Sequence, residues 1–372
     1  MKKILTCSAI ILLFCANTNA QSDCGTRLKE SEKESYNRIL AAARLLQQQG
    51  PEAVTYYHIR VFIHDFISND ATDSAWTYNE IISEFNQASN FFSQYNMCLV
   101  LAGIDYPRNT AFKDNFSTSN FNSLLPLAHS YTIDLTLHKI LMEGADTLNG
   151  NAYTIPSKWF SLSRGAIGQR SFAHELGHCL GLLHTFETAF GLECPDGSNA
   201  SSSGDKIPDT RATPATDSIL NANTNASCLY TGNQGMICNL NNFQLYNPEI
   251  INLMSYGKRT CRSAFTDGQV AVMNASLVGI VELQQTWFAP PSFTLIAPLV
   301  GTIILDGDSY VSGLTVQIGN NNSSINVFIG GTNAIQRIIS PSQIVIKPGV
   351  RLLQPTNERG KILIRPSGYC QE

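Results

Sequence analysis

One short segment constrains this chain more than any other feature, the run HELGHCLGLLH at residues 174–184, which holds three of its seven histidines. On an α-helix, positions i and i+4 lie one turn apart on the same face, so His174 and His178 can direct imidazole nitrogens at one metal ion. Glu175 lies about 100° round the helix, where its carboxylate can reach a water molecule on that metal. The apolar spacing predicts a helix over Arg170–Leu183 that carries a metal site.

The third histidine requires a chain reversal after the helix. A straight helix would carry His184 away from the metal, and Gly181 is the residue best able to adopt the left-handed conformation that turns the chain back. Three histidines leave one position for water and substrate, whereas a structural zinc site closes all four positions with protein ligands. Zinc lowers the pKa of such a water to about 7, so Glu175 can act as the general base near neutral pH. We therefore predict a catalytic zinc ion held by His174, His178 and His184.

The other four histidines lack such neighbours in the sequence. A metal site needs several donors at a suitable spacing, and no such spacing surrounds them. We expect each to be an ordinary surface residue or a hydrogen-bonded core residue: His58, His64, His129 and His138.

The N-terminus indicates the compartment. Two lysines precede an apolar run at residues 4–15, and a short stretch of small and polar residues ends at Ala20. This pattern is typical of a secretory signal peptide over residues 1–20, and the run is shorter than the span of about 20 apolar residues that crosses a bilayer. Lipid attachment at Cys15 or Cys24 is a weaker alternative because a bulky or charged residue precedes each cysteine. We expect a secreted or cell-surface protein with no transmembrane segment.

Two domains are expected after the signal peptide, because the remaining chain exceeds what one hydrophobic core usually fills. Strand and helix patterns alternate over residues 55–288, which is typical of an α/β domain. We expect strands at residues 55–66, 98–104, 132–137 and 150–155, and helices at residues 78–95, 170–183 and 266–285. Residues 289–372 hold short apolar runs separated by turn residues, which predicts a small all-β domain, either a sandwich or a β-stack.

Residues 188–250 are rich in Gly, Ser, Asn, Asp and Thr, which predicts a long loop region that needs tethers. Four cysteines lie between Cys194 and Cys261, and none has the Cys-x-x-Cys spacing usual in structural zinc sites. An oxidising compartment allows disulfides instead. The cysteines that follow residue 20 are Cys24, Cys98, Cys179, Cys194, Cys228, Cys238, Cys261 and Cys370.

Further motifs accompany the zinc-binding segment: HTF at residues 184–186, GDKIPDT at 204–210, NLMSY at 252–256, and FTDGQ at 265–269. Together they resemble the pappalysin family of metzincin zinc endopeptidases, which carry a methionine turn beneath the zinc. The resemblance covers roughly residues 55–285. It implies a metzincin-type α/β (α+β) catalytic domain with a twisted mixed sheet and a long zinc helix, which acts on protein or peptide substrates.

The resemblance also assigns roles to individual residues. Met254 would form the hydrophobic floor under the zinc, and Tyr256 would reach towards the metal or the oxyanion. A structural calcium ion would be bound by Asp205, Thr210 and nearby backbone carbonyls, since oxygen ligands suit a hard cation. A plain turn rich in Asn and Asp is the alternative for this loop. Ser255 departs from the family, where an aspartate is usual.

The family pairs its four cysteines of the loop region in an overlapping pattern. That pattern implies disulfides from Cys194 to Cys238 and from Cys228 to Cys261. Four cysteines allow three pairings in principle, so the sequence by itself leaves the other two open.

Residues 21–54 are expected to be a pro-segment that keeps the enzyme latent. The residues Cys24-Gly25-Thr26 match a short motif near the start of pappalysin precursors, and a thiolate is a good fourth zinc ligand. Cys24 would then be the latency switch. The alternative is a structural disulfide from Cys24 to Cys98 or Cys370.

Other functions remain open from the sequence. The chain could act mainly as a zinc-containing surface-binding or adhesive protein through residues 289–372, although Glu175 argues for catalysis. A zinc hydrolase of non-peptide substrates is a further alternative. The C-terminal domain would suit contact with a cell surface or the secretion machinery. A formal net charge of −4 gives no indication of nucleic-acid binding.

Overall fold

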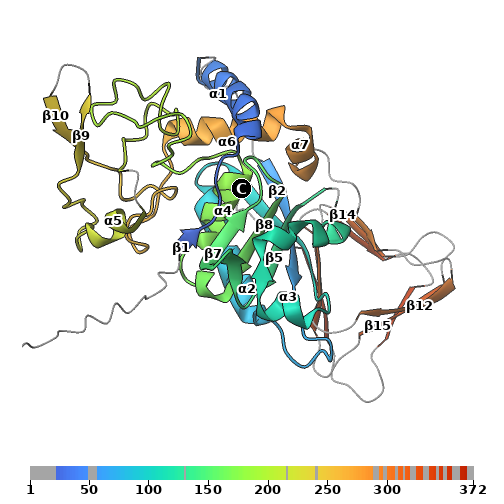
Figure 1. Cartoon of the computed structure of the whole chain (residues 1–372). Helices are drawn as coiled ribbons and strands as arrows, with labels where there is room; N and C mark the ends of the chain where they lie inside the picture. The colour runs from blue at the N-terminus through green and yellow to red at the C-terminus, as the bar shows by residue number, and fades with distance from the viewer. Residues whose placement is uncertain are drawn as a thin grey trace, which may run out of the picture.

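The structure is a computed structural model that describes residues 22–48, 57–129, 131–214, 217–238 and 242–287, and short strands between residues 293 and 366. A twisted mixed sheet forms its centre (Figure 1). In sheet order its strands are β3 (Met97–Asp105), β2 (Tyr57–Asp65), β5 (Ile133–His138), β8 (Trp159–Ser163), β7 (Asp146–Ala152), β6 (Leu141–Glu143) and β4 (Phe116–Ser117). The first four are parallel and β7 is antiparallel to β8, so the predicted α/β class is confirmed.

Alternating burial gives this sheet one strongly apolar face. Ile59, Val61 and Ile63 of β2 are fully buried in a core that also contains apolar side chains of α2 (Tyr78–Ser93) and α4 (Ser171–Cys179). α2 begins with a capping box, in which the Thr77 hydroxyl accepts from the Glu80 N–H and the Glu80 carboxylate accepts from the Thr77 N–H. α4 packs against β7 and β8, which places its histidines beside the end of the sheet.

Some elements differ from the sequence prediction. β8 was not predicted, because a five-residue strand buried on both faces shows no alternation of apolar and polar residues. The strand expected at residues 150–155 is the end of the longer β7. The expected closing helix divides at the extended residue Ile280 into α6 (Asp267–Gly279) and α7 (Val281–Trp287). Short helices complete this part: α3 (Thr110–Asp114) and 3₁₀ turns at Glu30–Glu32, Thr118–Ser123, Leu125–Leu127 and Arg164–Ala166.

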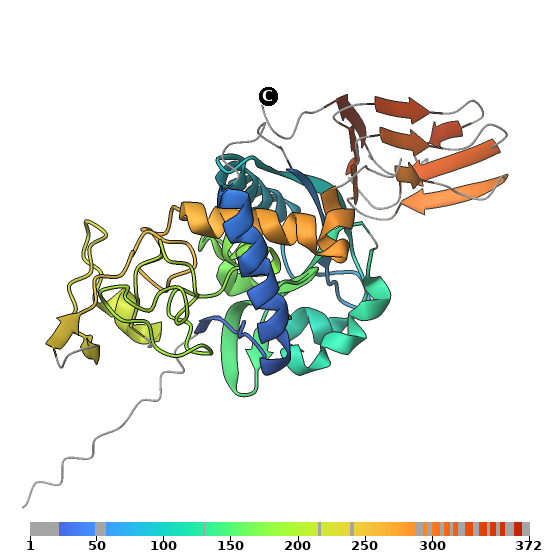
Figure 2. The ribbon, with the colours of Figure 1, turned by 90° about the horizontal axis from the view of Figure 1, so that it is seen from above.

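The N-terminal segment is packed, although its charged and Gln-rich sequence predicts one helix over residues 22–50 with little to form a core. β1 (Ser22–Cys24) is extended, and α1 (Lys33–Gln48) lies across α6 (Figure 2). The buried side chains of α1 join the main core: Tyr36, Ile39, Leu40 and Ala43. The segment therefore completes the core of the domain rather than forming one of its own. Full burial of one Leu or Ile side chain contributes about 1.5–3 kcal/mol to the stability of the fold.

The region at residues 188–250 is irregular, as predicted from its composition. Its described residues form only a short helix, α5 (Asp217–Ala222), and a hairpin of β9 (Gly235–Cys238) and β10 (Asn242–Leu245). Two disulfides hold it: Cys194–Cys238 joins its start to β9, and Cys228–Cys261 joins it to the segment before α6. These are the two pairs that the family resemblance implies.

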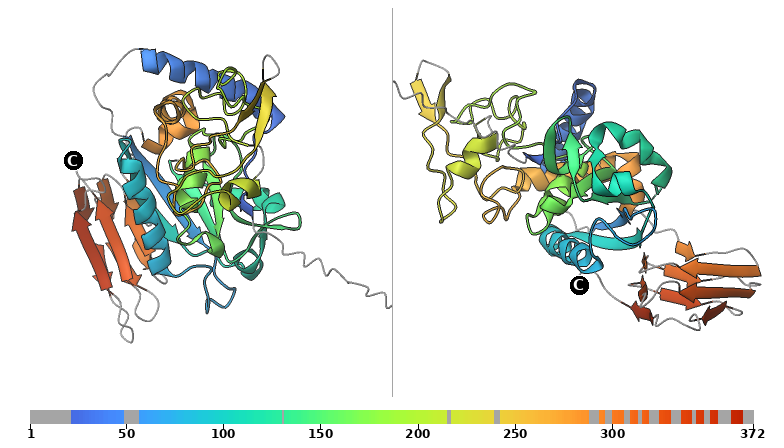
Figure 3. Two further views of the ribbon diagram at one scale, coloured as in Figure 1. Left: turned by 90° about the vertical axis from the view of Figure 1, so that its left-hand side faces the viewer. Right: turned by 60° about the horizontal axis from the view of Figure 1, so that its bottom comes forward.

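The described C-terminal strands form rows (Figure 3). Within a row, each strand pairs in parallel with the strand that comes three later in the chain. The rows are β11–β14–β17 (Phe293–Leu295, Thr315–Ile318, Gln343–Ile346), β12–β15–β18 (Val300–Leu305, Ser324–Ile329, Val350–Leu353) and β13–β16–β19 (Ser309–Ser312, Ile335–Ser340, Lys361–Pro366). Repetition of parallel strands is the pattern of a stack, and a sandwich would need antiparallel sheets facing each other. β13 also pairs antiparallel with β3 at the edge of the central sheet.

Among the helices that the structure describes, none combines the length and the apolar character that a membrane span needs.

Candidate active site

The helix that carries the histidines is shorter than predicted, because α4 ends at Cys179 rather than Leu183. Gly181 follows with a φ of +94°, the left-handed conformation expected of it. A Cβ atom at Gly181 would lie 2.4 Å from Ser276 Oγ on α6, so space as well as conformation favours glycine here. The early end of α4 allows the chain to return His184 to the other two histidines.

The three histidines converge. His184 Nε2 lies 3.3 Å from His174 Nε2 and 3.1 Å from His178 Nε2, and all three side chains are buried. Two ligands on one tetrahedral zinc ion, with Zn–N bonds of about 2.0–2.1 Å, lie about 3.4 Å apart. The spacing of the three nitrogen atoms therefore fits a zinc ion at their centre.

The other ring nitrogens fix the orientation of two of these histidines. His174 Nδ1 donates to the Leu253 carbonyl at 2.8 Å, and His178 Nδ1 donates to the Leu182 carbonyl at 2.7 Å. Because a carbonyl can only accept, both Nδ1 atoms carry the proton and both Nε2 atoms keep a lone pair for a metal. Burial, and then the neighbouring histidines, lower the pKa of His178 and His184 well below the ordinary value. The neutral form that zinc binds is thus the favoured one.

Glu175 lies beside this cluster and is fully buried. Its Oε2 accepts a hydrogen bond from Thr26 Oγ1 at 3.0 Å and from Cys24 Sγ at 3.4 Å. A Cβ atom at Gly150 of β7 would lie 2.6 Å from Glu175 Oε1. Gly150 therefore provides the space for the carboxylate, a role that the sequence alone did not reveal.

The turn at Met254 lies against the zinc helix. Met254 Sδ would be 2.8 Å from a Cβ atom at Gly177, so the helix needs glycine where the methionine packs. Asn252 Oδ1 accepts from the Met254 N–H at 2.9 Å, and the Asn252 amide donates to Gln269 of α6 at 2.8 Å. The bonds from Asn252 anchor the turn to α6. Gly177, Asn252 and Gln269 were not singled out from the sequence.

Tyr256 lies next to the third histidine. Its ring packs against His184 with 5.0 Å between centroids, and its hydroxyl donates to the Cys24 carbonyl at 2.8 Å. The expected position near the metal is therefore compatible with the structure. The group that it contacts is a peptide carbonyl of the N-terminal segment.

Cys24 lies beside the histidine cluster. It is buried, its Sγ lies 3.5 Å from His178 Nε2, and it groups with the three histidines as a possible metal-binding set. It is a thiol and not part of a disulfide, which contradicts the alternative pairing with Cys98 or Cys370. Burial, and then the Glu175 carboxylate, raise the pKa of Cys24 well above its ordinary value.

β1 holds Cys24 in this place. It pairs parallel with β7, so that Cys24 lies opposite Gly150, and the Gly25 N–H donates to the Gly150 carbonyl at 3.0 Å. The Ala152 N–H donates to Thr26 Oγ1 at 2.7 Å. The N-terminal segment thus occupies the edge of β7 beside the histidines.

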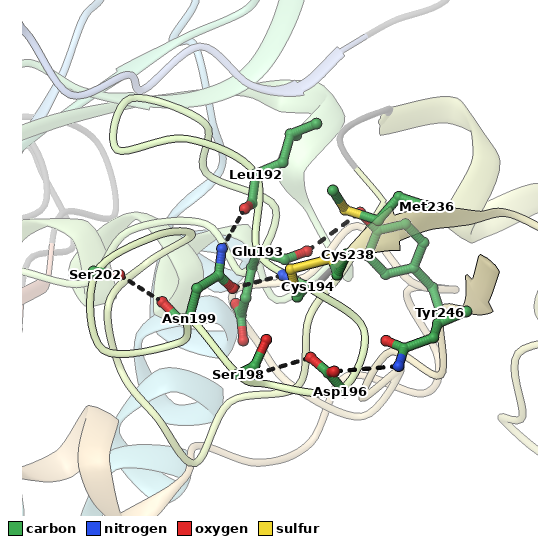
Figure 4. Close-up of a disulfide and its surroundings, with 11 residues drawn as sticks. Leu192, Glu193, Cys194, Asp196, Ser198, Asn199, Ser202, Met236, Cys238 and Tyr246 are labelled. Carbon is green, nitrogen blue, oxygen red and sulfur yellow. Dashed lines mark hydrogen bonds between the residues drawn. A yellow bond between two sulfur atoms is a disulfide. The ribbon is translucent and has the colours of Figure 1, made fainter. Parts of the chain in front are cut away.

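The loop after the zinc helix contains a second acidic site. Asp205 is fully buried and accepts from the Ile207 N–H at 2.9 Å and from Thr210 Oγ1 at 2.8 Å. Glu193, which lies beside the Cys194–Cys238 disulfide (Figure 4), is also buried, and neither of its carboxylate oxygens has a hydrogen-bond partner among the described residues. Burial raises the pKa of Asp205 to about 7, and burial followed by Asp205 raises that of Glu193 to about 8. Two buried carboxyl groups with such pKa values fit a cation.

Glu193 was not predicted from the sequence, because no motif precedes it and only the fold brings it to Asp205. Asp209 of the same loop has another role. Its carboxylate accepts from Thr266 Oγ1 at 2.8 Å and from the Gly268 N–H at 2.7 Å, so it binds the N-terminus of α6.

Residues 163–278 match the model of a peptidase family described as pregnancy-associated plasma protein-A. Over this part of the chain, the match supports that family. Its members are the pappalysins that the motifs resemble, so the chain is a metalloendopeptidase with a catalytic zinc and with protein or peptide substrates. The zinc-binding segment, the acidic loop and the methionine turn all lie inside the matched range.

Two solved structures of a pappalysin are also similar to this chain. One is mature mirolysin of Tannerella forsythia in complex with a cleaved peptide, with a TM-score of 0.42, and the other is mirolysin in complex with compound 9, with a TM-score of 0.43. In both cases the identity is 17%, and the similarity covers 63% of this chain and 97% of the other. A search of curated proteins finds no significant relative.

Proposed function

We propose that this pappalysin is exported as a latent precursor and hydrolyses peptide bonds with zinc held by His174, His178 and His184. The observation that carries the proposal is the convergence of three Nε2 atoms beside the buried carboxylate of Glu175, with His184 Nε2 3.1 Å from His178 Nε2 and 3.3 Å from His174 Nε2. Zinc bound in this way supplies a water of pKa about 7 and polarises the carbonyl under attack.

Glu175 is the general base in this proposal. Its carboxylate accepts a proton from the attacking water and returns it to the nitrogen of the departing amine, so one residue serves both half-reactions. Its Oε2 already accepts two hydrogen bonds from the N-terminal segment, which indicates that donors can reach it from the open side. Removal of that segment leaves this oxygen for the water.

Tyr256 binds the substrate carbonyl in this proposal. Its hydroxyl donates to the carbonyl of Cys24, a peptide group beside the histidines, at 2.8 Å. A substrate carbonyl at the same place would receive the same hydrogen bond, which strengthens as negative charge develops on the oxygen. Met254 supports the histidines from below and has no chemical step.

Latency follows from the position of residues 21–54. Cys24 Sγ offers a fourth ligand where water would bind, and β1 covers the edge of β7. α1 holds the segment on α6 through buried apolar side chains. Activation then requires cleavage of the chain after α1, and the expected boundary at residue 54 lies outside the described residues.

Export and calcium complete the proposal. The signal peptide at residues 1–20 lies outside the described residues, so export rests on its sequence pattern. Calcium would be bound by Asp205, with Glu193 as the ligand that the structure adds, because both are buried carboxyl groups on one disulfide-linked loop. The hydroxyl of Thr210 now donates to Asp205, and it can turn a lone pair towards the ion instead.

The proposal is tested by hydrolysis of denatured casein with the full chain after removal of the pro-segment. Activity should disappear on chelation of zinc and return when zinc is added back. Binding to cells without proteolysis would instead favour the alternative of a surface-binding protein. Cleavage of small esters or amides without casein cleavage would favour a hydrolase of non-peptide substrates.

A further inference from the structure

A second group of metal-binding side chains lies outside the active site. It consists of His64 on β2, Asp134 near the start of β5, and His129 in the segment before β5, and their donor atoms all lie within 4.8 Å of one another. β2 and β5 are parallel neighbours in the sheet. His64 alternates with Ile63, whose side chain lies in the main core, so His64 points to the opposite face of the sheet.

His64 is oriented as a metal-binding histidine is. Its side chain is fully buried, its Nδ1 lies 2.7 Å from Asp105 Oδ1, and its Nε2 makes no hydrogen bond to a described residue. The Asp105 carboxylate can only accept a hydrogen bond, so Nδ1 keeps its proton and a neutral His64 presents the Nε2 lone pair to the centre of the cluster. His174 and His178 are oriented in the same way by carbonyl groups in the active site.

The separations agree with ligands on one ion. Asp134 Oδ1 lies 3.5 Å from His64 Nε2 and 3.2 Å from His129 Nδ1. The corresponding separations between the histidines of the active site are 3.1 and 3.3 Å, and ligands of a tetrahedral zinc ion lie about 3.4 Å apart. These two separations in each cluster are therefore similar.

The surroundings also suit a cation. The side chain of His129 is 39% exposed, so an ion can enter from solvent and a water can complete its coordination. Phe62 stacks on the His129 ring with 3.9 Å between centroids, which fixes the ring. Asp105 and Asp134 supply negative charge. Lys158 is a nearby cation, and its Nζ donates to the His129 carbonyl at 3.1 Å.

We propose that His64, His129 and Asp134 bind a second zinc ion. The ion joins two neighbouring strands and the segment that precedes β5, so its effect is on stability and not on hydrolysis. An ion pair of protonated His64 with its two carboxylates is the competing state. The zinc-bound cluster and the ion pair differ by one zinc ion per chain.

The test is the zinc content of the full chain, loaded with zinc, desalted and measured by mass spectrometry. We expect two zinc ions per chain in the wild type and one in His129→Gln. This substitution keeps the size of a partly exposed side chain and the hydrogen bond from the residue 129 N–H to Asp134 Oδ2. His58→Ala is the matched control, because His58 lies on β2 with His64 but outside the cluster. This variant should keep two zinc ions. Melting curves verify that each variant is folded.

Equal zinc contents in the wild type and His129→Gln would overturn the proposal, as would an equal loss in His58→Ala. His184→Ala separates this site from the active site, because it should retain the second ion. A zinc content in His184→Ala equal to that of the wild type would count against the active-site assignment alone. Loss of both ions in His184→Ala would contradict an independent second site.

Discussion

Gly150→Ala tests whether strand β7 of the sheet places Glu175. The new Cβ atom would lie 2.6 Å from both Cγ and Oε1 of Glu175, and the ordinary contact distance begins at 3.4 Å. The carboxylate must therefore move by about 0.8 Å, or β7 must move with it. Displacements of about 1 Å can cost about 10²-fold in rate, so we expect kcat to fall by about 10²-fold, or about 2.7 kcal/mol of barrier.

The assay is hydrolysis of a fluorogenic peptide by the chain after removal of the pro-segment, with the zinc content measured on the same sample. Zinc should stay bound, because Gly150 contacts the base and not the three histidines. Gly279→Ala is the matched control, since a Cβ atom at Gly279 meets no other atom within 4 Å. A kcat of Gly150→Ala within twofold of the control would refute the placement of Glu175. Loss of zinc would show that the substitution acts on the ligands instead.

Three further predictions follow from the sites. Cys24→Ala should give a precursor that cleaves peptide before its pro-segment is removed, and unchanged latency in a zymogen assay would contradict the switch. Asp205→Asn should abolish the rise in melting temperature that calcium gives. That rise should be larger at pH 8 than at pH 5, because the raised pKa values of about 7 and 8 at Asp205 and Glu193 keep both carboxyl groups protonated at pH 5. Without calcium, the stability of the fold should fall as pH rises towards 8, because the folded-state pKa values lie above the unfolded value of about 4. A calcium-induced rise in melting temperature that is equal at pH 5 and pH 8 would refute the site.

The sequence predicted those parts of the candidate site that depend on the spacing of residues along one helix. His174, Glu175 and His178 belong to one helical turn, so their positions follow from helix geometry. The position of His184 required only that Gly181 reverse the chain. The φ of Gly181, +94°, is the left-handed conformation expected of that residue. The end of α4 at Cys179 was harder to predict, because the apolar pattern continues beyond it.

Residues brought together by the fold left no signal in the sequence. Gly150 and Gly177 are needed because another element packs within 3 Å of their missing Cβ atoms, and a sequence does not show which element that is. Glu193 reaches Asp205 only through the irregular loop. His64 and His129 looked like ordinary histidines because they lie far apart in the chain, whereas the parallel pairing of β2 with β5 places their neighbourhoods together. His138 does fit that expectation, with Nδ1 bound to the Phe112 carbonyl at 2.7 Å.

The N-terminal segment shows a different limit. Its helix looked too polar to have a core, yet the buried side chains of α1 fill a surface that α6 provides. Amphipathic patterning predicts that a helix has an apolar stripe, but the partner of that stripe is a property of the fold.

The most direct test of the central claim is Glu175→Gln, measured for peptide hydrolysis and zinc content on one preparation freed of its pro-segment. Glutamine keeps the size of the side chain but cannot accept the proton, so we expect kcat/KM to fall by at least about 10²–10⁴-fold with the zinc content of the wild type. Hydrolysis at the wild-type rate would contradict Glu175 as the general base, and a loss of zinc equal to the loss of activity would contradict the division of roles between Glu175 and the three histidines.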